Sequence, residues 1–170
     1  MSGTDVYFLL DRSGSMSDST VIHELTEFLK LQNQQNRISL FFFNQEVEKI
    51  TSLQRVSMVN IEQIENLYIP CGSTSLFDAL DYVVLDAEVN SDKPPVIVIY
   101  TDGVDTSSKT CRSFDVRSAV FELQKRGWTF IFMGASPEAY HSAGSIGIPR
   151  THTVDAMRKN CFNDLLEYFS

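Results

Sequence analysis

Four short apolar runs, separated by longer segments that mostly have helical periodicity, constrain this chain more than any other feature. They are Val6–Leu10, Ile38–Phe43, Val96–Tyr100 and Thr129–Met133. Runs with so little polar alternation predict strands that are covered on both faces, as strands of parallel sheets are. The order of these runs and the segments between them therefore decides the fold class.

Between the runs, apolar residues recur at helical spacing and predict helices. Ser75 followed by Asp78 predicts a capping box at the start of one helix. Ser136-Pro137-Glu138 predicts the start of another, and Gly127 is expected just past a helix end. The apolar positions that define the helical segments are Val21 to Leu29, Ile61 to Leu67, Leu76 to Val84, Val116 to Leu123 and Phe162 to Phe169.

Two weaker strands complete the pattern. Val47–Thr51 is charged and follows Ile38–Phe43 after the short turn Asn44-Gln45. A turn that short joins antiparallel neighbours only, and the charges favour an edge strand. A brief strand is also expected near Thr151–Val154.

The sum predicts an α/β fold: a doubly wound, Rossmann-like, mostly parallel six-stranded sheet with one antiparallel edge strand and helices on both faces. In such sheets ligands bind at the carboxyl ends of the strands, where the strand order reverses. The loops after Leu10, around Pro70–Ser75 and after Tyr100 are therefore the candidate ligand-binding loops.

Length, charge and cysteine content exclude some classes of protein. A chain of 170 residues suits a single domain over residues 1–170. A net charge of -8 argues against a nucleic-acid partner, and no stretch has the roughly 20 apolar residues of a membrane span. Cys71, Cys111 and Cys161 are an odd number without close pairing, so we expect reduced thiols and a cytoplasmic location.

Polar residues of one chemical kind occupy all three loops. Asp11, Ser13 and Ser15 follow the first strand, Thr74 precedes a helix, and Asp102 follows the strand Val96–Tyr100. These hydroxyl and carboxylate oxygens are hard ligands, which suit Mg²⁺, Mn²⁺ or Ca²⁺. Alternate residues can turn to one side past a strand end, with Gly14 expected to allow the tight path.

The charge of this set predicts what completes the site. Two carboxylates, Asp11 and Asp102, neutralise a doubly charged ion, while the three hydroxyls add no charge. Such a metal stays electrophilic and keeps an open position. An anionic oxygen from outside the chain is the natural last ligand.

The motif Asp11–Ser15 resembles the DxSxS motif of the metal-ion-dependent adhesion site in von Willebrand factor A (integrin I-like) domains. Thr74 within Gly72–Leu76 and Asp102 within Thr101-Asp102-Gly103 resemble the other two parts of that site. The resemblance spans nearly the whole chain, and Phe132–Ile148 is similar to compact bacterial or phage members. It implies a protein-interaction module, not an enzyme, in which Mg²⁺ is bound by these five residues and grips a partner's Glu or Asp. Some similar proteins work beside ATPases or in multi-protein assemblies.

The same residues are compatible with other functions, to different degrees. A Mg²⁺-dependent phosphatase or phosphotransferase of the haloacid dehalogenase type would use Asp11 as nucleophile, but Ser13 stands where that family has a second Asp. Nucleotide binding is disfavoured because neither GxGxxG nor GxxxxGK[ST] occurs. A structural subunit that self-assembles through its metal face stays open.

Several residues near the predicted site have plainer interpretations. Asp18 and Asp105 either bond to the metal ligands from behind or, more simply, are solvated loop carboxylates. Arg12 is expected at the surface, where it could face a partner. The histidines, His23, His141 and His152, show no ligand spacing.

Overall fold

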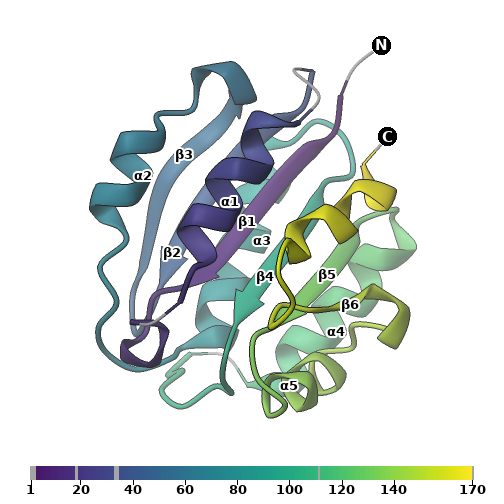
Figure 1. Cartoon of the computed structure of the whole chain (residues 1–170). Coiled ribbons are helices and arrows are strands. Elements are labelled where there is room, and N and C mark those ends of the chain that lie inside the picture. The colour runs from purple at the N-terminus through teal and green to yellow at the C-terminus, as the bar shows by residue number, and fades with distance from the viewer. Residues whose placement is uncertain (1–2, 18, 33–34, 111, 170) are drawn as a thin grey trace.

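A six-stranded sheet lies between two layers of helices in the computed structural model, which describes residues 3–17, 19–32, 35–110 and 112–169 (Figure 1). The strands are β1 (Asp5–Asp11), β2 (Arg37–Phe43), β3 (Val47–Arg55), β4 (Val96–Thr101), β5 (Thr129–Gly134) and β6 (Thr153–Asp155). The α-helices are α1 (Val21–Lys30), α2 (Ile61–Leu67), α3 (Leu76–Asn90), α4 (Ser113–Lys125) and α5 (Ala139–Ser145). Four 3₁₀ segments are η1 (Gly14–Met16), η2 (Val56–Met58), η3 (Arg150–His152) and η4 (Cys161–Tyr168).

The strand order is β3-β2-β1-β4-β5-β6, and every neighbouring pair is parallel except β2 with β3. This confirms the predicted fold class, including the antiparallel edge strand. From β1 the chain builds outwards through β2 and β3 on one side, then returns to place β4 on the other. The order therefore reverses between β1 and β4, whose carboxyl ends lie side by side.

Strict alternation along β1 divides the core in two, because successive side chains of a strand point to opposite faces. Val6, Phe8 and Leu10 join the cluster covered by α1, α2 and η4, whereas Tyr7 and Leu9 join the cluster covered by α3, α4 and α5. All five are fully buried, which explains why the run is apolar throughout. Among the described residues, no helix is both long enough and apolar enough to cross a bilayer.

A buried ion pair fixes the starting end of β1. The carboxylate of Asp5 has no exposed surface and accepts hydrogen bonds from Arg37 Nε at 2.8 Å and Nη2 at 2.6 Å. Asp5 and Arg37 are also register partners of β1 and β2, and Ser91 Oγ donates to the same carboxylate at 2.7 Å. The bidentate geometry and the third donor satisfy a charge that would otherwise be costly to bury.

Three elements differ from those predicted. Helix α5 begins at Ala139, not at Ser136-Pro137. Its start is delayed because Ser136 Oγ donates to the backbone oxygen of Asp102 while residues 137 and 138 form a turn. The last strand is Thr153–Asp155, because Arg150–His152 forms a 3₁₀ turn.

The C-terminal segment is the third difference: it is a 3₁₀ helix where an α-helix was expected. With three residues per turn, Phe162 and Leu165 fall on one side, and both are buried, whereas Leu166 is half exposed. The Phe162 ring lies 6.2 Å from Phe8, 5.8 Å from Phe28 and 5.7 Å from Tyr100 between centroids. One aromatic ring thus anchors this segment to the sheet.

We expect Phe162→Ala to lower the free energy of unfolding by about 3–5 kcal/mol, because it removes a fully buried ring from three aromatic contacts. Leu166→Ala, on the exposed side of the same segment, should lower it by less than about 1 kcal/mol. Urea unfolding of both variants checks the difference. Equal losses would show that the ring does not anchor the segment.

The Cys161 thiol should be unreactive in the folded protein. Burial, followed by the nearby Glu24 carboxylate, raises the pKa of this thiol from 9.0 to about 12. The unfolded thiol ionises from about pH 9, so the stability that Cys161 contributes is present below pH 9 and is lost as the pH rises towards 12. In a Cys111→Ser background, Ellman's reagent at pH 8 should therefore modify the exposed Cys71 and reach Cys161 only after unfolding. Equal rates at the two thiols would contradict this.

Candidate metal centre

Asp11 ends β1 at the reversal of strand order, and its side chain is fully buried. One carboxyl oxygen accepts from the Ser13 backbone N–H at 2.7 Å and the other from Thr101 Oγ1 at 2.7 Å. Burial raises the pKa of Asp11, while the donors from Thr101 and Ser13 lower it and the charge of Asp102 raises it. The carboxylate is thus held in place, but it carries an electrostatic penalty that a cation would relieve.

A chain of hydrogen bonds joins the next three predicted residues. Ser13 Oγ lies 3.1 Å from Ser15 Oγ, and Ser15 Oγ donates to Asp102 Oδ1 at 2.9 Å. Together with the Asp11–Ser13 bond, these contacts bring four of the five predicted residues together at the ends of β1 and β4. They place hydroxyl and carboxylate oxygens within a few ångströms of one another.

Thr74 lies in the neighbouring loop before α3 and is buried. Its backbone oxygen accepts from the N–H groups of Thr106 and Ser107, at 2.8 and 3.1 Å. Within the described chain, no hydrogen bond joins its hydroxyl to the other four residues. The loops themselves are joined by the Gly14 N–H, which donates to Gly72 O at 3.0 Å.

The two glycines of that contact differ in whether their backbone conformation requires glycine. Gly72 has a φ of +82°, where other residues are strained. Gly14 does not have a positive φ, and an added Cβ would lie 3.7 Å from Gly72 O, an ordinary contact. The expectation that Gly14 is needed for a tight path was therefore wrong, and the conformational requirement falls on Gly72.

Arg12 is not the surface residue that was expected. Its side chain is only 14% exposed and its guanidinium lies 5.4 Å from the Phe42 ring centroid. Nη1 donates to Glu48 Oε1 and to Leu67 O, both at 2.9 Å. Arg12 thus ties the first loop to β3 and α2 and turns its charge away from the site.

The capping box predicted for α3 is also absent. Ser75 makes no cap bond and its hydroxyl lies 2.7 Å from Ser107 Oγ instead. The first N–H groups of α3 are satisfied across the loop: Phe77 N–H by Asp105 Oδ1 at 3.1 Å and Asp78 N–H by Ser108 Oγ at 3.0 Å. Asp105 is therefore a capping residue, while Asp18 lies outside the described residues.

Sequence reasoning missed three residues that position the site. Thr101 holds the Asp11 carboxylate, Tyr68 OH donates to the Asp11 backbone oxygen at 2.6 Å, and Ser136 Oγ donates to the Asp102 backbone oxygen. Only Thr101 carried a signal, because it directly precedes Asp102. Tyr68 and Ser136 are distant in sequence and show no pattern.

The donor set fits a hard divalent cation. Among the described residues, no three His, Cys, Asp or Glu side chains converge as a metal group, so a metal here would need the hydroxyls beside Asp11 and Asp102. A hollow of about 350 Å³ adjoins Ser15 and Asp102, and Ser19, Tyr100 and Met157 also line it. It offers space for a group that approaches from outside.

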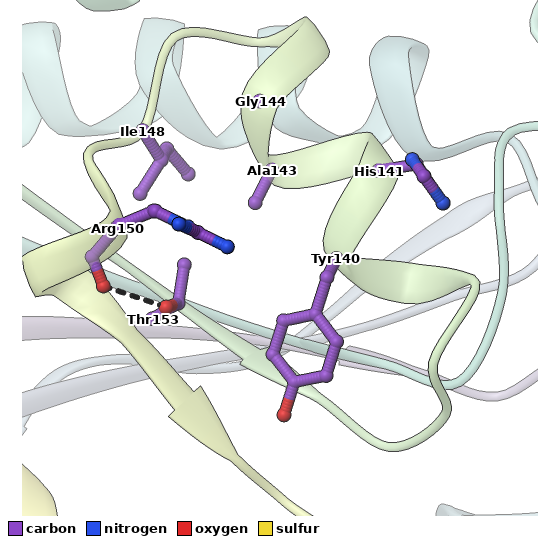
Figure 2. A pocket seen from close by; sticks show the side chains of 7 residues that line it. All are labelled: Tyr140, His141, Ala143, Gly144, Ile148, Arg150 and Thr153. Carbon is purple, nitrogen blue, oxygen red and sulfur yellow. Dashed lines mark hydrogen bonds between the residues drawn. The ribbon is translucent and has the colours of Figure 1, made fainter.

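A larger hollow of about 470 Å³ lies elsewhere, between α5 and β6 (Figure 2). Figure 2 shows Tyr140, His141 and Arg150 around it, with Thr153 Oγ1 donating to Arg150 O at 2.7 Å. No carboxylate lines this hollow, so it does not suit a divalent cation. The predicted ligands gather at the smaller one.

The fold and this oxygen-rich strand-end site define a doubly wound α/β domain with candidate metal ligands where its strand order reverses. The sequence profile of the von Willebrand factor type A domain matches residues 5–165. The chain therefore belongs to the von Willebrand factor type A family, as the motifs predicted. A search of curated protein sequences finds no match.

Solved structures show the same fold at low sequence identity. Manganese-loaded TRAP protein of Plasmodium vivax has a TM-score of 0.67 and 21% identity, over 88% of this chain and 66% of that one. Proximal thread matrix protein 1 from the mussel byssus, with a zinc-occupied MIDAS motif, has a TM-score of 0.72 and 15% identity, over 89% and 41%. BatB from Bacteroides thetaiotaomicron has a TM-score of 0.61 and 13% identity, over 78% and 67%. This chain spans less than half of the mussel protein.

Thr101→Val should destabilise the metal-free protein by about 1–3 kcal/mol, because it keeps the shape but leaves one oxygen of the buried Asp11 carboxylate without its donor. Thr153→Val removes a more exposed hydroxyl and should change stability by less than about 0.5 kcal/mol. Thermal unfolding in EDTA measures both. If the two variants behave alike, Thr101 does not support Asp11.

Proposed function

We propose that this domain binds one divalent cation, Mg²⁺ in the cell or Mn²⁺ or Ca²⁺ in its place, and uses it to bind a Glu or Asp of a partner protein. The five proposed ligands are Asp11, Ser13, Ser15, Thr74 and Asp102. The observation that carries the proposal is the hydrogen-bonded chain from Asp11 through Ser13 and Ser15 to Asp102, beside an open hollow.

The chemistry of the partner follows from charge. Asp11 and Asp102 offset the charge of a divalent ion, and the hydroxyls leave it electrophilic. Arg12, the nearest cation in the first loop, is engaged by Glu48 and Leu67 and does not compete for an anion. The manganese-loaded and zinc-occupied relatives support a divalent metal at this position of the fold.

Asp11 is poorly placed to act as the nucleophile of a phosphotransferase. Its carboxylate has no exposed surface and both oxygens accept hydrogen bonds from within the chain. A nucleophile must be reached by the bulky phosphoryl group itself, whereas a cation needs only one of the lone pairs that these hydrogen bonds leave free. These contacts favour a binding role over a catalytic one, and we propose that the domain is not an enzyme.

We place the domain in the cytoplasm, with an interaction in a multi-protein or ATPase-associated assembly as its role. The free thiols of Cys71 and Cys161 support a reducing compartment.

Metal binding is tested first, by isothermal titration of EDTA-stripped protein with Mg²⁺ and Mn²⁺. Asp11→Ala and Ser15→Ala should each weaken binding at least about tenfold, the loss that even outer-shell partners of a metal cause. Ser17→Ala alters an exposed serine two residues beyond the set and should bind as wild type does. Wild-type affinity in Asp11→Ala and Ser15→Ala would refute the site.

Partner binding is tested by capture on immobilised protein with Mg²⁺, against EDTA and against Ser15→Ala. A partner that uses the metal should be retained only by wild type and Ser17→Ala with Mg²⁺, and should be lost when its own acidic residue becomes Asn or Gln. Retention in EDTA would show that contact does not run through a metal.

A further inference from the structure

Large apolar side chains are concentrated on the outer side of two adjacent helices. Of eleven exposed large hydrophobic residues among those described, five lie on α3 and α4. On α3 these are Tyr82, Leu85 and Val89, exposed by 48, 56 and 82%; on α4 they are Phe114 and Phe121, exposed by 74 and 57%. Exposed apolar side chains gathered on one face mark an interaction surface, named here the α3–α4 face.

The two helices carry opposite charge. Helix α3 has four acidic residues and no basic one. The stretch from Arg112 to Arg126, which is α4 with its caps, has four basic residues against two acidic ones. The chain as a whole has a net charge of -8, so a basic helix is the exception in it. The adjacent helix α3 has the opposite charge and could therefore attract α4 of a second copy.

Their shapes are complementary as well. A hollow of about 410 Å³ on α4 is lined by Phe114, Phe121, Arg117, Ser118 and Glu122, together with Gly147. On α3, Leu85 and Val89 protrude into solvent. Each copy of the chain thus presents a hollow with two phenylalanine rings on a basic helix and apolar side chains on an acidic one.

The heights of these features also match. Glu88 and Arg126 form an ion pair across the seam between α3 and α4 at 3.8 Å, so they lie at one level. Leu85 precedes Glu88 by three residues and Phe121 precedes Arg126 by five, which places them within about 3 Å in height at 1.5 Å per residue. The helices run in the same direction, because each leads from the carboxyl end of the sheet to its other end.

We propose that the α3–α4 face is the interface of a symmetric dimer. A two-fold axis that runs along the seam places α3 of one copy over α4 of the other, twice. Apolar side chains of each acidic helix then meet the Phe114–Phe121 hollow of the partner copy. Such an isologous contact is self-complementary and closes at two chains.

The dimer leaves the metal centre free. The proposed ligands lie at the carboxyl ends of β1 and β4, whereas the α3–α4 face lies along the sides of helices on one face of the sheet (Figure 1). Two metal centres would be carried by one particle. Association through this face is therefore independent of divalent metal, unlike assembly through the metal site.

The first experiment is sedimentation equilibrium of the full chain over a concentration series, in EDTA and in Mg²⁺. Wild type should shift from 19.2 kDa to twice that mass equally in both buffers. Phe121→Asp should raise the dimer dissociation constant at least about tenfold, as loss of a central aromatic contact does. Met58→Asp replaces a side chain that is 70% exposed outside α3 and α4, and should not change it.

A charge exchange tests the orientation. One chain carries Asp81→Lys and Glu88→Lys, which leave α3 with two basic residues against Asp78 and Asp86, so its α3 no longer attracts a basic α4. The other carries Lys125→Glu and Arg126→Glu, so both of its helices are acidic. Each alone should dimerise at least about tenfold more weakly than wild type, and an equimolar mixture should dimerise with an affinity within about tenfold of wild type.

Three outcomes would overturn the proposal. They are a wild type that stays monomeric at every concentration, equal weakening by Phe121→Asp and Met58→Asp, and a mixture of the exchanged chains that stays monomeric. A dimer that forms only with Mg²⁺ would point instead to assembly through the metal site. Metal binding measured on Phe121→Asp separates this proposal from the function proposed above.

Discussion

The burial of one carboxylate governs the carboxyl end of this sheet. Asp11 ends the central strand with no exposed surface, and an isolated ionised group there would be strongly disfavoured. Two hydrogen-bond donors, the Ser13 backbone N–H and the Thr101 hydroxyl, offset this desolvation penalty. The path of the first loop follows, because the Ser13 N–H must face back towards Asp11. That turn is also what directs the Ser13 and Ser15 hydroxyls to one side.

The same end of the sheet is reinforced by contacts that do not involve the proposed ligands. Tyr68 holds the backbone of Asp11 and packs edge-on against Phe42, at 5.1 Å between ring centroids. Arg12 covers that same ring from the next position. Backbone, ring and guanidinium form one unit, so the loop is shaped before any ion arrives. A preshaped loop lowers the ordering cost of binding, which is how weak neutral ligands can hold a cation.

Much of this architecture could be predicted because burial leaves a simple trace in sequence. Strands covered on both faces are apolar throughout, as Val6–Leu10 and Val96–Tyr100 are, and the polar residues that follow them fall at one edge of a parallel sheet. What could not be predicted was which of two possible hydrogen-bond partners a polar side chain would take. Ser75 could cap its own helix or bond across to Ser107, and Ser136 could begin a helix or hold the Asp102 backbone. Arg12 could face solvent or reach Glu48. Each depends on a group remote in the chain, and short-range patterns carry no information about it.

The loop over residues 103–110 affects how the domain would transmit a pulling force. It is bonded to Thr74 through Thr106 and Ser107 and to the first turn of α3 through Asp105 and Ser108, so the loops that carry Thr74 and Asp102 form one body. The Asp11–Ser15 loop, rooted in β1, is joined to this body by the bond from the Gly14 N–H to Gly72 O. A tensile load applied at this end would therefore pass into β1 and β4 along their axes. Each of those strands has a parallel neighbour on both sides. The load would be carried in shear across many hydrogen bonds at once, instead of peeling an edge strand bond by bond.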